Sequence, residues 1–576
     1  MKLPVFGSLS DPKLPGDLVA GLTVWAVLVP EALAYASIAG VSPVVGLYAA
    51  PGALILYAAF GSSRQLIIGP GAATAALSAA IVGDLATQGA SDYVQLTATL
   101  AITVGLLAIA AAVLRLGFIA NFISEPVLKG FIIGLALTVM VGQLPKLFGI
   151  EKGAGNFFEQ LWDFVKNIDQ TSGLTLLVGG LSLVLVLGLK LWKPAIPASL
   201  VAVLLGILAV QLFGLDGSGV AIVGPIKSGL PSFGIPDVSG SGFLSLLGGS
   251  FGLMFIGFAE GLGAAKTYAA KEGYEIDVNR ELLGLGAANI GAGLSSGMVV
   301  GGSLSKTAVN ASAGAKGQLS GLVTAVLTVI TILFLTGLFE DLPEATLAAV
   351  VIAALVELVD IPSLVRLYRA HTKGLGRIYG FAARPDFIAA IAAILGVLVF
   401  DTLPGLVIGI VVSVLLLLYR ASIPHVAVLA QASGTNGPFV DAKRNPEAAE
   451  VPGVAILRVE SALFFANADA VRDHIRAHAA DEHIKAVVID AETVPAIDVT
   501  AGQMLMELGH DLRAQGKRLV LAREIGQVRD AIDHTDSGSG SAPPEIDTYP
   551  TVRAAVAALR SGLTIDTAAE QYGNKP

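Results

Sequence analysis

Apolar runs of about 20 residues alternate with short polar stretches over the first 420 residues of the chain. A run of this length spans the apolar core of a bilayer when it forms a helix. The pattern therefore predicts a polytopic α-helical membrane domain over residues 17–422, with about fourteen elements. Their expected ranges are 17–38, 43–61, 66–84, 93–114, 125–144, 173–191, 196–214, 243–266, 281–296, 298–313, 318–338, 343–359, 386–401 and 404–420.

Two of these runs are interrupted and cannot be ordinary membrane helices. Residues 298–310 read MVVGGSLSKTAVN: an apolar triplet expected to be extended, two glycines, then a helix start with Ser303 as a natural N-cap. Residues 66–76, LIIGPGAATAA, have the same form at an offset of 232. Broken backbone at membrane depth is tolerated only where it lines a cavity or is buried in protein. Such a pair in two halves of a chain predicts the binding site of a transporter.

A second matching pair supports an internal repeat. Residues 30–34, PEALA, resemble residues 259–263, AEGLG, at the similar offset of 229. We therefore expect a first repeat at 17–215 and a second at 240–420. Seven elements per repeat is an odd number, so the second repeat is inverted relative to the first.

Basic residues predict the orientation, because Lys and Arg are enriched in cytoplasmic loops. With residues 1–16 inside, most basic loop residues are also inside, including five in the connection 360–385. We expect a multi-pass protein of a bacterial inner (plasma) membrane, with a cytoplasmic N-terminus and a cytoplasmic C-terminal domain. The outer loop 145–172 contains GNFFEQLWDFVKNI, which is typical of an amphipathic surface helix.

The last quarter of the chain has another pattern. Strand-like and helix-like segments alternate over 454–562, which predicts a small α/β domain. Residues 423–453 are expected to connect to this domain and begin it, with 431–453 a loop, and 563–576 form a tail. Residues 421–576 carry 14 basic and 21 acidic side chains, which argues against a nucleic-acid partner.

Composition excludes several kinds of site. The chain has no cysteine, so disulfides, thiolate metal sites and cysteine nucleophiles are excluded. The seven histidines lie outside the apolar runs, and His474, His478 and His483 are expected on a solvated helix face. No phosphate-loop pattern and no nucleophile–base cluster is present. We therefore expect no metal, no cofactor and no enzyme activity.

The interrupted segments carry the candidate chemistry. A helix that begins within the membrane presents free backbone N–H groups and a positive dipole end, so two facing starts would bind an anion. Lys306 lies in the first turn after the second break, where it adds a cation, although it could instead reach an interface or pair with a carboxylate. Glu31 and Tyr35 are one turn apart beside Pro30 and are expected to line the cavity.

Glu260 is a carboxylate within an apolar run. Placing such a group in a membrane costs about a few kcal/mol of free energy, which suggests that it has a function. Three roles are open: ligand of a coupling ion, proton carrier, or structural partner of Lys306. A sodium site needs several oxygen ligands, and the following residues 261–265, GLGAA, offer no hydroxyl group. This favours a proton over sodium.

Four motifs together resemble the sulfate permease family of anion transporters: GLTVWAVLVPEALAYASIAGVSPVVGLYAA, LIIGPGAATAAL, GGSLSKTAVNASAGA and VPAIDVTAGQML. The resemblance implies a seven-plus-seven inverted repeat with core and gate domains, a C-terminal STAS domain, elevator motion and a homodimer. It also implies a possible phosphorylation of Thr500, which could instead only cap the helix that follows, and a possible protein partner at the STAS domain. The implied anion site is Glu31, Tyr35, Gly71, Ala72, Ala73, Leu304, Ser305 and Lys306, with Glu260 as the residue that binds the coupling ion.

The family pattern leaves the charge of this site open. Many relatives have Gln at the position of Glu31 and Arg at that of Lys306. Glu31 could be protonated, paired with Lys306, or turned away from the ligand. We expect proton-coupled symport of a small inorganic oxyanion, sulfate or bicarbonate first. The alternatives are an uncoupled anion channel, a sodium-coupled bicarbonate or dicarboxylate transporter, and a membrane-anchored STAS sensor.

Overall fold

The computed structural model describes residues 14–562, with gaps at 84, 87–90, 118–123, 154, 194–195, 227, 238–239, 357, 370–383, 401, 433–436 and 537–545. The expected tail 563–576, most of the N-terminal stretch 1–16 and most of the connection 360–385 therefore lie outside the described residues. The chain forms two compact units, and the division falls within one helix, after Ser413. The two units are described separately.

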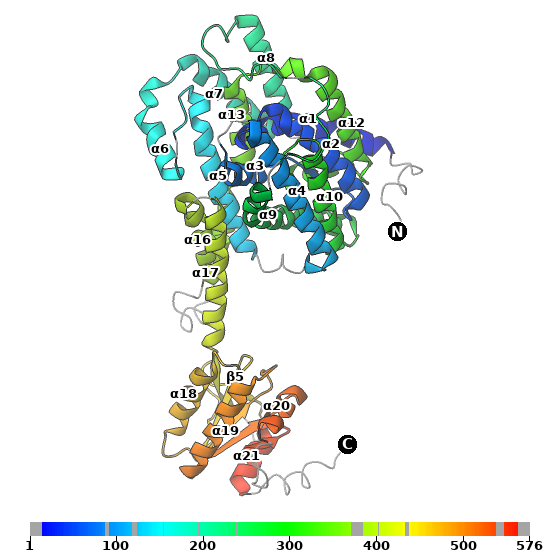
Figure 1. Ribbon diagram of the computed structural model, residues 1–576. Helices are drawn as coiled ribbons and strands as arrows, with labels where there is room; N and C mark the ends of the chain where they lie inside the picture. Colours follow the sequence, from blue (N-terminus) through cyan, green and yellow to red (C-terminus); the bar gives the residue numbers. More distant parts are fainter. Residues whose placement is uncertain are drawn as a thin grey trace. The chain divides into compact units, whose positions relative to one another are not determined.

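The membrane unit is helical (Figure 1), and each of the fourteen predicted elements has a counterpart in the part of the chain that is described. The first repeat contains α1 (Leu14–Ile38), α2 (Pro43–Phe60), β1 (Ile67–Gly69), α3 (Ala72–Gly83), α4 (Ser91–Val113), α5 (Glu125–Phe148), α6 (Phe157–Lys166), α7 (Gly173–Trp192) and α8 (Ala198–Phe213). The second contains α9 (Gly240–Glu272), α10 (Val278–Leu294), β2 (Gly301–Ser303), α11 (Leu304–Ser312), α12 (Leu319–Ile330), α13 (Glu344–Val356), α14 (Ile361–Arg369), α16 (Pro385–Phe400) and α17 (Thr402–Ser422). Nine of the described helices are long and apolar enough to cross a membrane.

The two repeats pack in a reciprocal way. Helix α1 packs on α12, and its counterpart α9 packs on α4. Likewise α1 contacts α11, whereas α9 contacts α3. Figure 1 shows α2, α4 and α10 side by side near the middle of this arrangement. Exchanging the two repeats therefore preserves these contacts, as expected for the predicted repeat.

The two interrupted segments meet through their strands. β1 and β2 pair in antiparallel fashion, with Ile67 opposite Ser303 and Gly69 opposite Gly301. The predicted position of the second strand was wrong by three residues: the glycines belong to the strand, and the apolar triplet 298–300 precedes it. The glycines are needed there because α9 passes so close that a Cβ on Gly302 would lie 2.4 Å from the Cα of Gly261.

Buried polar side chains saturate the backbone around these strands. Asn289 donates to the carbonyl of Val300 and accepts from its N–H, both at 3.0 Å. Asn310 donates to the carbonyl of Gln65 at 2.8 Å, and Gln318 donates to that of Leu66 at 3.0 Å. Unpaired backbone groups in an apolar interior cost several kcal/mol, so these side chains make the broken segments stable.

A short amphipathic helix, α6, occupies the loop 145–172 as predicted. Asn156 caps it by accepting from the N–H of Glu159, whose carboxylate accepts from the N–H of Asn156. Phe158, Trp162 and Val165 are exposed large apolar side chains, which suits a helix lying at a membrane surface.

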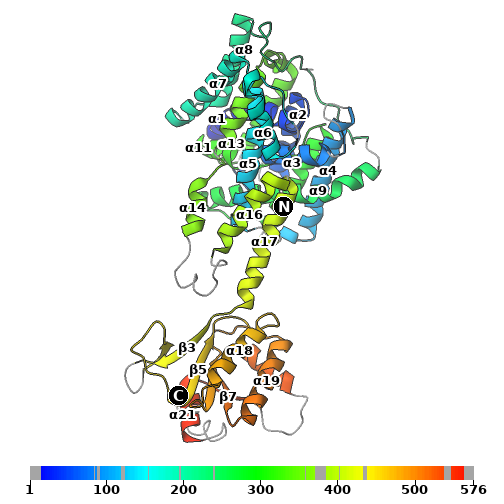
Figure 2. The same cartoon turned by 90° about the vertical axis from the view of Figure 1, so that its left-hand side faces the viewer.

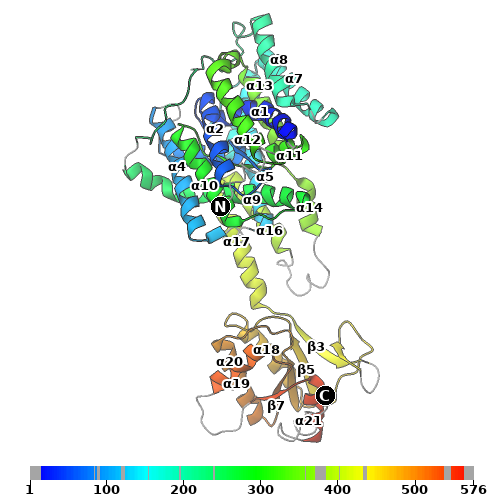
Figure 3. The same cartoon turned by 90° about the vertical axis from the view of Figure 1, so that its right-hand side faces the viewer.

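The C-terminal unit is a six-stranded sheet in the order β4-β3-β5-β6-β7-β8, with β5 to β8 parallel (Figures 2 and 3). Along β6, Val487 and Ile489 pack against α18, α19 and α20, while Val488 faces the opposite side with α21. The elements are β3 (Val426–Gln431), β4 (Phe439–Asp441), β5 (Val454–Val459), α18 (Ala468–Ala479), β6 (Ala486–Asp490), α19 (Val499–Ala514), β7 (Arg518–Ala522), α20 (Gly526–Asp536), β8 (Asp547–Tyr549) and α21 (Val552–Ser561).

One prediction for this unit was wrong. Residues 431–453 were expected to be a loop, but β4 lies within them and pairs with β3. This strand has only three residues, Phe-Val-Asp, and its partner supplies the register, so the local pattern carries almost no signal. The expected flexible loop 537–544 lies outside the described residues.

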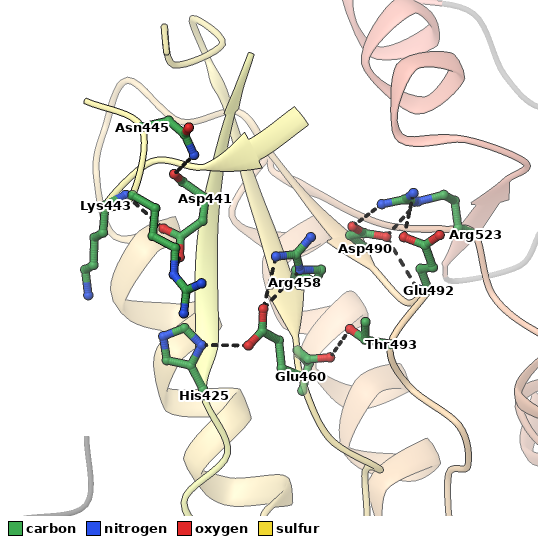
Figure 4. Close-up of polar contacts among 12 residues, drawn as sticks. His425, Asp441, Lys443, Asn445, Arg458, Glu460, Asp490, Glu492, Thr493 and Arg523 are labelled. Carbon is green, nitrogen blue, oxygen red and sulfur yellow. Dashed lines mark hydrogen bonds and ion pairs between the residues drawn. The ribbon is translucent and has the colours of Figure 1, made fainter. Parts of the chain in front are cut away.

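Ion pairs cluster at the carboxyl ends of the parallel strands (Figure 4). The fully buried carboxylate of Asp490 accepts from Nε of Arg523 at 2.9 Å, and Arg523 NH1 lies 2.6 Å from Glu492. The hydrogen bond to Asp490 raises the pKa of the Arg523 guanidinium. These contacts fix the loops that follow β6 and β7.

The contact between β2 and α9 gives a test of the fold. A Gly302→Ala variant should lose about 1–3 kcal/mol of stability, because backbone must move to admit the methyl group. The matched control is Gly263→Ala on α9, the helix that packs against Gly302. No atom lies within 4 Å of a Cβ added at Gly263. Thermal unfolding of both proteins in detergent checks this. Equal melting temperatures for the two variants would contradict the close packing.

Candidate anion site

A cavity of about 600 Å³ lies in the membrane unit beside the two strands. Helices α1, α3, α9 and α11 form one wall, and α5, α7, α8 and α13 form the other, with Lys190 contributed by α7. All the residues predicted for the site line this one cavity: Glu31, Tyr35, Gly71, Ala72, Ala73, Glu260, Leu304, Ser305 and Lys306.

Lys306 and Glu31 form a buried ion pair. Lys306 Nζ lies 2.8 Å from Glu31 Oε2, and the two residues are only 1% and 6% exposed. Glu31 was expected to be protonated, paired with Lys306 or turned away from the ligand, and in the structure it is paired with Lys306. Burying two charges is costly, so both must be well satisfied where they lie.

The ammonium group of Lys306 is surrounded by further electron-rich atoms. It donates to the carbonyl of Pro70 at 3.1 Å, directly before α3, and lies 5.3 Å from the centre of the Tyr35 ring. Lys306 thus ties the second interrupted segment to the first one and to α1. Its charge is already compensated before any ligand enters.

Two helix N-termini open onto the cavity. Ala72 and Ala73 begin α3, and Leu304 and Ser305 begin α11. Ser303 is the N-cap of α11, as predicted, and its hydroxyl accepts from the N–H of Lys306 at 3.3 Å. The first N–H groups of a helix have no partner within the helix and carry its positive dipole end. The cavity therefore offers backbone donors from two directions to an anion.

Glu260 also lines the cavity, from α9. Among the described residues it has no hydrogen bond and no ion pair, because Lys306 pairs with Glu31 instead. The structural role considered for Glu260, as the partner of Lys306, is therefore not what the structure shows. It is a carboxylate that faces the cavity and is available to a proton or another cation.

Sequence reasoning missed the residues that hold the half-helices in place. Thr307 accepts from the N–H of Ile67 at 3.1 Å and donates to the carbonyl of Ser303 at 2.6 Å. Glu281 is buried and accepts from the Tyr57 hydroxyl and from the N–H of Ser63, just before β1. Glu281 stands at the polar edge of the predicted element 281–296, next to Arg280, so it lacked the signal that singled out Glu260 within its apolar run.

In the C-terminal unit, Thr500 lies exposed in the first turn of α19. The N-cap is Asp498, which accepts from the N–H of Ala501 at 2.8 Å, so Thr500 is not needed for capping. Its hydroxyl is accessible, and its phosphorylation stays a prediction. The described residues hold no group of three His, Asp or Glu side chains that could bind a metal.

The sequence matches two family models. The model described as the sulfate permease family matches residues 14–380, and the STAS domain model matches residues 445–555. The chain belongs to the sulfate permease family. A Mycobacterium tuberculosis protein named Probable sulfate transporter is 35% identical over 521 residues, which cover 90% of this chain and 91% of that protein. Sulfate transporter 1.1 of Arabidopsis thaliana is 31% identical, over 88% of this chain and 80% of its own.

Solved structures show the same fold. The murine Solute Carrier 26 family member A9 anion transporter, in an inward-facing state, has a TM-score of 0.86 at 23% identity. That comparison covers 97% of this chain and 94% of the other. The transmembrane domain of the cyanobacterial bicarbonate transporter BicA has a TM-score of 0.59 at 23% identity, over 70% of this chain and 98% of that domain. These structures confirm the predicted fold. Membership of the sulfate permease family confirms the prediction of a transporter rather than an enzyme.

The ion pair yields a prediction for stability. A Lys306→Met variant leaves the Glu31 carboxylate buried without a partner, so it should lose about 3 kcal/mol or more. Adding Glu31→Gln should restore most of that loss. A double-mutant cycle of thermal unfolding in detergent measures the coupling. Strictly additive effects of the two substitutions would show that the pair is not energetically coupled.

Proposed function

We propose that this protein is a secondary active transporter of a small inorganic oxyanion, sulfate or bicarbonate first, coupled to protons by symport. The membrane would be the inner membrane of a bacterium, with the N-terminus and the STAS domain in the cytoplasm. One observation carries the proposal: two half-helices present their N-termini to one cavity that also contains a neutralised Lys306–Glu31 pair and an unpaired Glu260.

The charge balance of the cavity supports coupling to a cation. Lys306 and Glu31 cancel, and each helix N-terminus contributes about half a positive charge. Lys190 on α7 also lines the cavity and adds a positive charge from the opposite wall. If Glu260 is ionised, it offsets both helix ends, so the half-helices themselves exert no net attraction on an arriving anion. Once Glu260 is protonated, the helix ends attract the anion. A proton and an anion therefore favour each other's binding at this site.

The walls of the cavity support an elevator movement. One wall comes from α1, α3, α9 and α11, which the family resemblance assigns to the core. The other comes from α5, α7, α8 and α13, which it assigns to the gate. Movement of the core against the gate would carry the anion with both half-helices. A homodimer and a protein partner at the STAS domain remain parts of this proposal.

Uptake into proteoliposomes tests the function. Labelled sulfate, bicarbonate and dicarboxylates would be compared under imposed proton and sodium gradients. We expect an inward proton gradient to drive uphill uptake of sulfate or bicarbonate. Uptake driven only by a sodium gradient would identify sodium, and not the proton, as the coupling ion. An unsaturable leak proportional to the driving force would indicate a channel.

A variant of Glu260 tests the coupling. Glu260→Gln keeps the shape of the side chain but cannot gain or lose a proton, so uphill uptake driven by a pH gradient should be abolished while anion exchange persists. The matched control is Glu272→Gln on the same helix, since Glu272 pairs with Lys316 near the helix end. Retained proton-driven accumulation in Glu260→Gln would limit Glu260 to a structural role.

A further inference from the structure

A second, smaller cavity of about 320 Å³ lies in the membrane unit. It is lined by the ends of α1 and α3, the later turns of α5, and the segment around α6. Leu135 on α5 lines both cavities, so the two are separated there by little more than one side chain. Figure 1 shows α3 and α5 next to each other at this place.

Helix α1 connects the two cavities. Thr23, Val27, Glu31 and Tyr35 follow one another at intervals of four residues along the main cavity, and Ser37 and Ile38 then line the smaller one. The main cavity extends toward the start of α1, at Thr23. The smaller cavity lies beyond the ion pair, at the end of α1. Under the predicted orientation, this is the outer side of the membrane.

The smaller cavity is lined by a side-chain amide that has no hydrogen-bond partner among the described residues. Gln143 on α5 is 8% exposed, lines the cavity and makes no hydrogen bond to any described residue. Its amide atoms are not fully enclosed by protein, so they can hydrogen-bond to water or to a ligand in the cavity. Its NH₂ group is a donor suited to an anion.

A cation without a counter-ion lies in the same place. A Cβ added to Gly142 would lie 3.7 Å from Lys152 Nζ, so the ammonium group is positioned over α5 where glycine leaves room. Lys152 has no ion pair within the described part of the chain, whereas Lys146 pairs with Glu344 at 3.1 Å. Desolvation and the nearby Lys146 both lower the pKa of Lys152, as expected for an ammonium lacking a compensating charge.

We propose that this cavity is an outer recruitment site for a small anion, held by the Gln143 amide and the Lys152 ammonium before it reaches the N-termini of the half-helices. The identity of the anion rests on the proposed transport function, but binding of the anion at this cavity does not depend on transport. Two carboxylates lie against the same loop, but neither pairs with Lys152 or lines the cavity. A Cβ on Gly153 would lie 2.5 Å from Asp163 Oδ2, and Glu159 accepts from the N–H of Asn156.

Protection from chemical modification tests binding directly. The purified protein in detergent is treated with an amine-specific acylating reagent, with and without sulfate or bicarbonate at constant ionic strength, and Lys152 is quantified by peptide mass spectrometry. We expect saturable slowing at Lys152 by threefold or more. Lys166, at the end of α6 and outside the cavity, is the internal reference and should react at an unchanged rate.

A variant of the main site shows whether the outer site is independent. In Glu31→Gln/Lys306→Met, protection of Lys152 should persist. Loss of protection there, or no protection in the wild-type protein, would overturn the proposal. A protein that protects Lys152 but transports neither sulfate nor bicarbonate would instead overturn the proposed function and leave this site standing.

Transport kinetics give the second readout. Lys152→Gln and Gln143→Leu should each raise the KM for uptake from the outer side about threefold to tenfold, with the maximum rate unchanged. Lys152→Arg should keep a KM near that of the wild type, and Lys166→Gln is the matched control. An unchanged KM in both Lys152→Gln and Gln143→Leu would contradict recruitment at this cavity.

Discussion

The antiparallel pairing of β1 with β2 is the constraint on which the membrane unit depends. Two segments of broken backbone lie in an apolar interior, where each unpaired N–H or carbonyl is costly. The two strands hydrogen-bond to each other, and Asn289, Asn310 and Gln318 hydrogen-bond to neighbouring backbone groups. Because the strands are fixed in register, the half-helices that follow them begin at the same cavity.

The same geometry decides how charge is distributed. Lys306 follows the second strand by one turn and reaches back to the carbonyl of Pro70, which follows the first strand. Glu31 on α1 then meets it as a counter-ion built into the protein. The attraction for an anion therefore comes from the helix ends, and the state of Glu260 sets its strength. The smaller cavity differs: its Lys146 pairs with Glu344, but its Lys152 has no such counter-ion among the described residues.

Much of this arrangement could be predicted from the sequence. Glycines and hydroxyl side chains within apolar runs revealed both breaks, and their equal spacing in the two halves revealed the repeat. All nine residues expected at the site and for coupling line one cavity, since the motif that starts each half-helix carries most of them. Alternation of short strands and helices likewise predicted the C-terminal sheet.

What the sequence could not predict depends on tertiary contacts. Glu31 and Glu260 are both carboxylates in apolar runs, and only the packing of α1 and α9 decides which one pairs with Lys306. The place of β2 is set by the close passage of α9 over Gly302, and β4 exists because β3 lies beside it. The smaller cavity is lined by residues from four separate elements, so no local sequence pattern could predict it.

Selenate replaces the sulfur of sulfate with an anomalously scattering atom, so it locates the anion directly. The central claim is that the anion is held by the N-termini of α3 and α11 rather than by a free lysine. Anomalous diffraction from crystals grown with selenate should show a peak within hydrogen-bond distance of the N–H groups of Ala72, Ala73, Leu304 or Ser305, with the Lys306–Glu31 pair intact. A peak beside Lys306 Nζ, in the place of the Glu31 carboxylate, would contradict this claim. So would an empty main cavity in a protein that transports selenate.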